Sequence, residues 1–90
     1  MNEIRINGRA ITSREQLHSQ LKEQLGLPDH YGRNLDALWD GLTGSAGLPL
    51  TIYWEHYSIS AERLGEYASK VAQLFREAEE ELEGFHFVVN

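Results

Sequence analysis

The chain has no cysteine among its 90 residues, so thiol catalysis and disulfide cross-links are excluded. Small secreted domains often depend on disulfides, and their absence here favours a reducing cytoplasm. The first residues, Met1-Asn2-Glu3, include no basic stretch and no apolar run, so we expect no signal peptide. No stretch approaches the roughly 20 apolar residues of a membrane span. The sequence therefore predicts a cytoplasmic protein.

Basic residues are also scarce. The chain has eight Lys and Arg residues against fourteen Asp and Glu residues, a formal net charge of −6. Nucleic acids require a basic patch, so this balance argues against a nucleic-acid partner and suits a basic protein instead. Apolar residues make up 41% of the chain and charged residues 24%, as in an ordinary globular domain. Ninety residues suffice for one such domain with a single core.

Three short segments have the pattern of β-strands. Residues 3–6 alternate in polarity before a turn at Asn7-Gly8, and residues 50–54 are β-branched and aromatic. Residues 85–89 form a third run of this type, and helical segments separate the three. Strands joined through helices pair in parallel by right-handed crossovers. The sequence therefore predicts a small two-layer α/β domain.

The helical segments have signals for their starts and ends. Thr12 or Ser13 is expected to cap the first helix, and Gly26 follows its last apolar residue. The apolar face of this helix is expected to hold three leucines spaced by four residues, Leu17, Leu21 and Leu25.

A longer helical region follows the second strand. Ser58 or Ser60 is expected to cap its start, and Gly65 to divide it into a short and a long helix. Gly84 is expected to stop it before the third strand.

A further helix is predicted near the middle of the chain, after a loop that begins at Asp29. Its apolar residues recur at intervals of three and four, the stripe of a helix packed on a core. They are Leu35, Leu38 and Leu42.

A second face of this central helix has the strongest functional pattern in the chain. At about 100° per residue, Asp36 and Asp40 lie together one turn apart. Trp39 lies between the acidic and apolar faces, Thr43 projects near Asp36, and Gly44 is expected to form the C-terminal cap. Taken alone, such a pair of carboxylates is typical of a solvated helix face. It also suits a surface that imitates successive phosphates for a basic partner.

The four histidines do not form a metal-binding signature. They occur without the H-x-x-x-H or H-E-x-x-H spacing of zinc sites, and no cofactor is expected. One of them, His30, lies in the loop before the central helix, where its titration would make binding depend on pH. The others are His18, His56 and His86.

Much of the sequence resembles one known family. The matching core is Leu27-Pro28-Asp29-His30-Tyr31-Gly32, Asn34-Leu35-Asp36-Ala37-Leu38-Trp39-Asp40 and Leu42-Thr43-Gly44. Further matches are Ile6-Asn7-Gly8, Leu17-His18, Leu21-Lys22, Pro49-Leu50 and Phe75-Arg76-Glu77-Ala78. These residues, in register over nearly the whole chain, resemble the barstar family of intracellular inhibitors of a secreted bacterial ribonuclease. The resemblance implies one barstar-like domain over residues 1–90, with a three-stranded parallel sheet and three to four helices packed beside it.

The resemblance also implies a function and a set of partner-binding residues. It implies an inhibitor of a small basic secreted ribonuclease, in which Asp40 occupies the main phosphate-binding site of the enzyme and Asp36 meets cationic groups nearby. Excess negative charge would steer the encounter. The implied contact residues are His30, Asn34, Asp36, Trp39, Asp40, Thr43, Gly44 and Glu77. Among them, Glu77 would form a peripheral salt bridge.

The sequence departs from the best-known member of the family at three positions near this surface. His30 replaces a tyrosine that packs on the enzyme's active site, and Ser45 replaces a tryptophan just after the helix. Arg33 places a cation where that protein has an acid. These changes remove stacking area and alter charge at the rim, where partner choice is decided.

Two other functions fit parts of the sequence. The same fold would serve as a binding module for a different basic protein or toxin without inhibiting a ribonuclease. Alternatively, Asp36 and Asp40 would divide acid and base roles in a small hydrolase, which requires a concave cleft around both and burial of one. The inhibitor is the favoured function, and we expect it to be a monomer when free, with no nucleic-acid or membrane partner.

Overall fold

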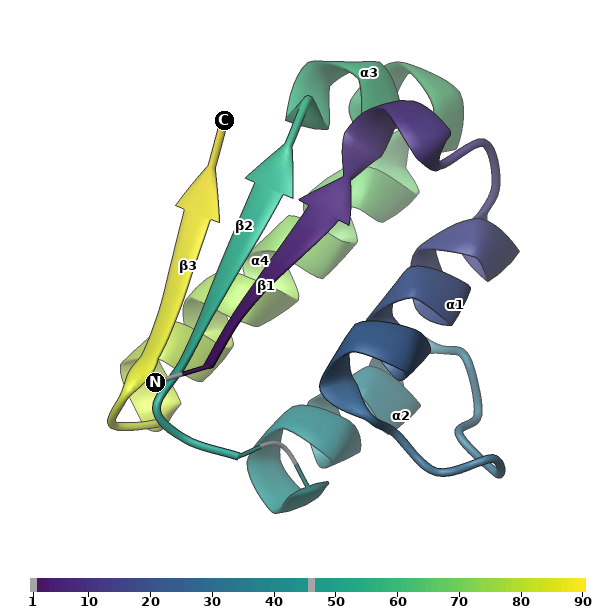
Figure 1. Ribbon diagram of the computed structural model, residues 1–90. Coiled ribbons are helices and arrows are strands. Elements are labelled where there is room, and N and C mark those ends of the chain that lie inside the picture. The colour runs from purple at the N-terminus through teal and green to yellow at the C-terminus, as the bar shows by residue number, and fades with distance from the viewer. Residues whose placement is uncertain (1, 46) are drawn as a thin grey trace.

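The computed structural model describes residues 2–45 and 47–90, and its elements alternate between strands and helices along the chain (Figure 1). None of the helices in this described part is long and apolar enough to cross a membrane. In chain order the elements are β1 (Asn2–Asn7), the 3₁₀ turn η1 (Gly8–Ala10), α1 (Arg14–Leu25), α2 (Leu35–Asp40), the π-helical turn η2 (Gly41–Ser45), β2 (Leu50–Glu55), α3 (Tyr57–Leu64), α4 (Glu66–Glu81) and β3 (Phe85–Val89).

The three strands form one parallel sheet in the order β1-β2-β3. Ile4 of β1 is opposite Ile52 of β2, and Ile52 is opposite Phe87 of β3. The central strand β2 is the most buried, with Ile52 and Trp54 fully enclosed. This confirms the predicted parallel α/β architecture, and α4 lies behind the strands in Figure 1.

The long helix α4 covers one face of the sheet because its apolar residues recur at helical spacing. Phe75, at its middle, is fully buried between the rings of β2 and β3. Its ring centroid lies 6.3 Å from that of Trp54, 6.4 Å from that of Phe85 and 5.0 Å from that of Phe87. Aromatic rings at these separations form the centre of the hydrophobic core.

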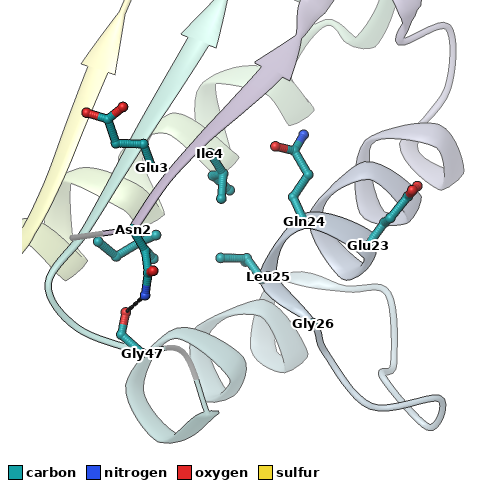
Figure 2. A pocket seen from close by; sticks show the side chains of 9 residues that line it. Asn2, Glu3, Ile4, Glu23, Gln24, Leu25, Gly26 and Gly47 are labelled. Atoms are coloured by element: carbon teal, nitrogen blue, oxygen red, sulfur yellow. Dashed lines mark hydrogen bonds between the residues drawn. The ribbon is translucent and has the colours of Figure 1, made fainter.

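Two glutamines of α1 close the outer edge of β1. The backbone N–H of Arg5 donates to Gln24 Oε1 (3.0 Å), and Gln24 Nε2 donates to the carbonyl of Arg5 (2.5 Å). One turn earlier, Gln20 makes the same pair of bonds with Asn7, at 3.0 and 3.3 Å. Figure 2 shows Gln24 extending from α1 into the space beside β1, above Leu25. Side-chain amides thus replace a fourth strand and protect this edge from unwanted pairing.

The first helix begins and ends where the sequence predicts. Ser13 is its cap, and its Oγ accepts a hydrogen bond from the backbone N–H of Gln16 (3.3 Å). At the other end Gly26 adopts φ 67°, a left-handed conformation that favours glycine, and the N–H groups of Gly26 and Leu27 both donate to the carbonyl of Lys22. The loop that leads to α2 therefore leaves α1 in a fixed direction.

The predicted caps of the next helical region are wrong. Helix α3 begins at Tyr57, after His56 at φ 55°, with no side-chain cap. Ser60 lies inside α3, where its hydroxyl accepts a hydrogen bond from Trp54 Nε1 and donates to the carbonyl of Gly8, both at 3.1 Å. Gly8 has no room for a side chain, because a Cβ there would lie 2.3 Å from the Glu55 carbonyl oxygen. Ser60 is buried by these long-range contacts, which its local sequence does not reveal.

The ends of the remaining helices agree in part with the sequence. Gly65 separates α3 from α4, as predicted. The prediction that Gly44 caps α2 is wrong, because the chain continues past Asp40 into the π-helical turn η2, which includes Gly44. The helical segment therefore extends one residue past Gly44, to Ser45, and its last turn is π-helical.

Candidate functional site

Helix α2 is anchored to the core by its apolar stripe. Leu38 is fully buried and Leu42 is 1% exposed. Gly41 packs directly on Leu27, because a Cβ at Gly41 would lie 2.9 Å from Leu27 Cδ2. This close contact fixes how far α2 stands from the preceding loop, and a larger side chain at Gly41 would push them apart.

The start of α2 is fixed by Asn34. Its Oδ1 accepts a hydrogen bond from the backbone N–H of Ala37 (2.7 Å), and its carbonyl accepts one from Leu38 (2.9 Å). The residue before it, Arg33, has φ 54°, a left-handed conformation that is uncommon outside glycine. The cap therefore sets the direction in which the carboxylates of α2 project.

The loop before α2 is held from inside by a buried polar network. His18 of α1 is 1% exposed, and its Nδ1 lies 2.6 Å from the Tyr31 hydroxyl of the loop. Its Nε2 lies 2.6 Å from the Tyr67 hydroxyl of α4. A neutral imidazole has one donor and one acceptor nitrogen, and each hydroxyl can play either part, so the network is satisfied. His18 thus ties α1, the loop and α4 together.

Burial keeps all three members of this network uncharged at neutral pH. The pKa of His18 is lowered to about 4. Burial is the larger cause, and the nearby Arg33 guanidinium is the smaller one. Burial likewise raises the pKa of Tyr31 and of Tyr67. The anchor beneath the loop is therefore a neutral hydrogen-bonded network.

The outer side of this segment bears the two carboxylates. Asp36 and Asp40 are both exposed, one turn apart on α2, and we call this pair the acidic face. Asp40 shares a hollow of about 210 Å³ with His30. Asp36 shares another, of about 350 Å³, with Trp39 and Glu77. The structure therefore brings His30 to Asp40 and brings Trp39 and Glu77 to Asp36.

Two further predicted contact residues lie beyond α2, in η2. The hydroxyl of Thr43 donates to the carbonyl of Trp39 (2.9 Å), so it stabilises the helical turn. Gly44 is exposed, and a Cβ there would meet nothing within 4 Å. The side chain of Ser45 lies outside what the structure describes. Gly44 leaves the end of this surface flat and open.

The arrangement of the carboxylates does not provide the environment that a hydrolase requires. That function needs one cleft around both residues and burial of one of them. Asp36 and Asp40 are instead both exposed. They open onto separate hollows and can offer negative charge to another molecule.

Sequence reasoning missed two features of this site. The first is the anchor formed by His18, Tyr31 and Tyr67; the helical period already placed His18 beside Leu17 and Leu21 on the buried side of α1, so the signal was present. The second is Gly41, whose contact with Leu27 has no sequence signal because it depends on the path of the loop.

Comparison with known proteins identifies related sequences. A family model described as Barstar (barnase inhibitor) matches residues 1–90, a range that includes the acidic face. The chain is also similar to the protein named "Putative ribonuclease inhibitor YrdF" of Bacillus subtilis (strain 168). The two are 50% identical over 82 residues, which cover 91% of this chain and 90% of that protein.

Proposed function

The chain belongs to the Barstar (barnase inhibitor) family, and from that premise we propose that it inhibits a small, basic, secreted ribonuclease by covering its active site. Members of this family are inhibitors and not enzymes. One observation carries the proposal: two exposed carboxylates stand one turn apart on a short helix whose other side is anchored in the core by the fully buried Leu38. The proposal extends to a cytoplasmic protein of one domain over residues 1–90, monomeric when free.

The acidic face imitates the phosphates of RNA. Asp40 enters the main phosphate-binding site of the ribonuclease, and Asp36 meets the cationic groups beside it. Residues at the same interface fill the space around them: His30 beside Asp40, and Trp39 and Glu77 beside Asp36. Asn34 holds the helix start, and Thr43 and Gly44 form the flat end of the surface.

The rigid support beneath α2 makes this binding efficient. Carboxylates on a helix fixed by a cap, a buried leucine stripe and the His18 network lose little freedom when they bind. The net charge of −6 attracts a basic enzyme before contact and raises the association rate. Rapid capture suits an inhibitor that protects the RNA of the cell that makes the ribonuclease.

The test is a titration of the protein into a panel of small, basic, secreted microbial ribonucleases while RNA cleavage is followed. We expect stoichiometric loss of activity for at least one enzyme. Asp40→Ala should weaken inhibition by about 30-fold or more, the effect of losing a central contact worth about 2 kcal/mol. Glu77→Ala, the matched peripheral change, should cost less than about fivefold.

Three outcomes would contradict the proposal. Equal and small effects of Asp40→Ala and Glu77→Ala would remove the phosphate-mimic mechanism. Failure against every ribonuclease, together with tight binding to a basic protein of another class, would favour the binding module. An association rate that does not fall when salt is raised would contradict electrostatic steering, because added salt shortens the screening length to about 10 Å at 0.1 M.

A further inference from the structure

Three cationic side chains line one hollow beside the start of α2. Arg14 comes from the first turn of α1, Arg33 from the loop and Lys70 from α4. The hollow has a volume of about 460 Å³, and we call it the basic hollow. Its lining also includes Asn34, Leu35, Asp36 and Tyr67. Three of the eight basic residues of an acidic protein thus gather at one place.

These cations retain capacity to bind. The Arg14 guanidinium stacks over the Tyr67 ring, with Cζ 4.3 Å from the ring centroid. Arg33 Nη1 donates to Ser19 Oγ (2.7 Å). Each guanidinium has five N–H donors, so these contacts orient both groups and leave most donors available. Within residues 2–45 and 47–90, the ion pairs engage Arg5 and Lys22 and none of these three cations.

The charge balance of the basic hollow is positive, unlike that of the whole chain. Its only carboxylate is Asp36, against three cations. Asn34 adds a neutral donor: its Oδ1 is occupied by the N–H of Ala37, and its amide NH₂ group remains. The lining therefore offers guanidinium, ammonium and amide donors from α1, the loop before α2 and α4.

Tyr67 forms a rigid floor of the basic hollow. Tyr67 is 9% exposed and is hydrogen-bonded to His18 through its hydroxyl. The Arg33 guanidinium also lowers the pKa of His18, an effect smaller than that of burial. Groups held over a fixed floor bind a ligand without having to be ordered first.

We propose that the basic hollow binds an oxyanion of the phosphate class, either free phosphate or the phosphate group of a nucleotide. Two guanidinium groups suit this ligand because their paired N–H donors match the oxygens of a phosphate, and Lys70 adds a point charge. Asp36 opposes the bound anion. The basic hollow shares Asn34 and Asp36 with the contacts proposed for the ribonuclease. The three cations that hold the phosphate are not among those contacts, so this proposal does not depend on that function.

The test is a titration of inorganic phosphate into the full-length protein at constant ionic strength, followed by calorimetry and by NMR of the arginine side-chain N–H groups. We expect saturable binding of one phosphate per chain, with shifts at Arg14 and Arg33. Arg14→Gln with Arg33→Gln should weaken binding at least about tenfold, since charge-assisted hydrogen bonds are lost. The matched control, Arg9→Gln with Arg76→Gln, removes the same charge elsewhere and should change binding less than about threefold.

Three single substitutions at two other positions keep the test decisive if loss of the Arg14 stack impairs folding. Lys70→Gln should weaken phosphate binding several-fold while Lys70→Arg retains it, and Asp36→Asn should strengthen it because the opposing charge is gone. A nucleoside 5′-monophosphate that binds tighter than phosphate identifies a nucleotide site, and equal affinity identifies the phosphate group alone. No saturation at tens of millimolar phosphate, or equal losses in the test and control pairs, would overturn the proposal.

Discussion

The inner and outer faces of the segment from Leu27 to Ser45 differ in almost every physical property. Inside, Leu38 and Leu42 are buried against the core, and Tyr31 is tied to the neutral His18. Outside, Asp36 and Asp40 are exposed and open onto separate hollows. The inner face thus fixes geometry, and the outer face offers charge. Stability and binding should therefore respond to different residues of the same short segment.

The contrast also shows why the two faces use polar groups differently. A charge buried beneath α2 would cost several kcal/mol unless paired, so the inner face uses a neutral imidazole between two hydroxyls. Within the described residues, every buried side-chain nitrogen or oxygen has a hydrogen-bond partner. The outer face meets water, so its carboxylates remain ionised without a desolvation penalty and are available to a partner.

The largest expected effect comes from the buried leucine. Leu38→Ala should lower the free energy of unfolding by about 2–5 kcal/mol, because it removes buried methyl groups and leaves a cavity. Asp40→Ala, two residues away on the outer side, should change it by less than about 0.5 kcal/mol. Urea denaturation followed by far-UV circular dichroism measures both values. Similar losses in the two variants would mean that the faces are not separable.

The next effect is a pH dependence set by the inner face. The pKa of His18 is lowered from 6.5 to about 4 by burial first and by Arg33 second. The unfolded chain therefore binds a proton at pH values where the folded chain does not. His18 should lower stability as the pH falls from 6.5 towards 4, by up to about 1.4 kcal/mol per pH unit, and add no further loss below that range.

The control for this pH dependence compares two histidines. His18→Gln should flatten the change in unfolding free energy between pH 6.5 and 4, while His30→Gln on the exposed loop should leave its slope as it is. Urea denaturation at several pH values gives both slopes. If His18→Gln retains the full slope, the acid sensitivity arises from the carboxylates and not from the buried network.

A smaller loss of stability is expected when one hydroxyl is removed from the His18 network and the aromatic ring is kept. Tyr67→Phe removes the hydroxyl that lies 2.6 Å from His18 Nε2 and leaves a buried nitrogen without its partner. This should cost about 1–3 kcal/mol. Tyr53→Phe is the matched change, because the Tyr53 hydroxyl lies 3.5 Å from the exposed Glu3 carboxylate, and it should cost less than about 0.5 kcal/mol. Thermal unfolding followed by circular dichroism measures both variants. Equal changes in the midpoint of unfolding would show that the contact between Tyr67 and His18 adds no stability.

The sequence predicted those features that local pattern determines. The three strands, a cap of α1 at Thr12 or Ser13, the Gly26 end of α1 and the break at Gly65 all follow from residues within a few positions of one another, and the structure shows that Ser13 is the cap. The stripe and the acidic face of α2 follow in the same way from the helical period. Local chemistry was sufficient there because tertiary contacts agree with it.

The wrong predictions lie where distant contacts decide. Ser60 has the composition of a cap, yet Gly8 and Trp54 bury it inside α3. Gly44 has the composition of a helix end, yet the chain adds a π-helical turn before leaving. The basic hollow joins cations from positions 14, 33 and 70, so no window of sequence contains it. The place of Ser60 depends on contacts with η1 and β2, and the basic hollow depends on how α1, the loop and α4 pack. A single sequence does not specify these distant contacts.

The smallest expected effect concerns Asn34, which belongs to both faces because it caps α2 while lining its outer flank. Asn34→Ala should lower the free energy of unfolding by about 1 kcal/mol, since the N–H of Ala37 loses its acceptor. For a domain of this size that corresponds to about 4–8 °C in the midpoint of thermal unfolding. Asn34→Asp retains an acceptor and adds a negative charge at a helix N-terminus, so it should match or exceed the native stability. If Asn34→Asp loses as much as Asn34→Ala, the cap does not stabilise α2, and the orientation of the acidic face rests on the buried leucines alone.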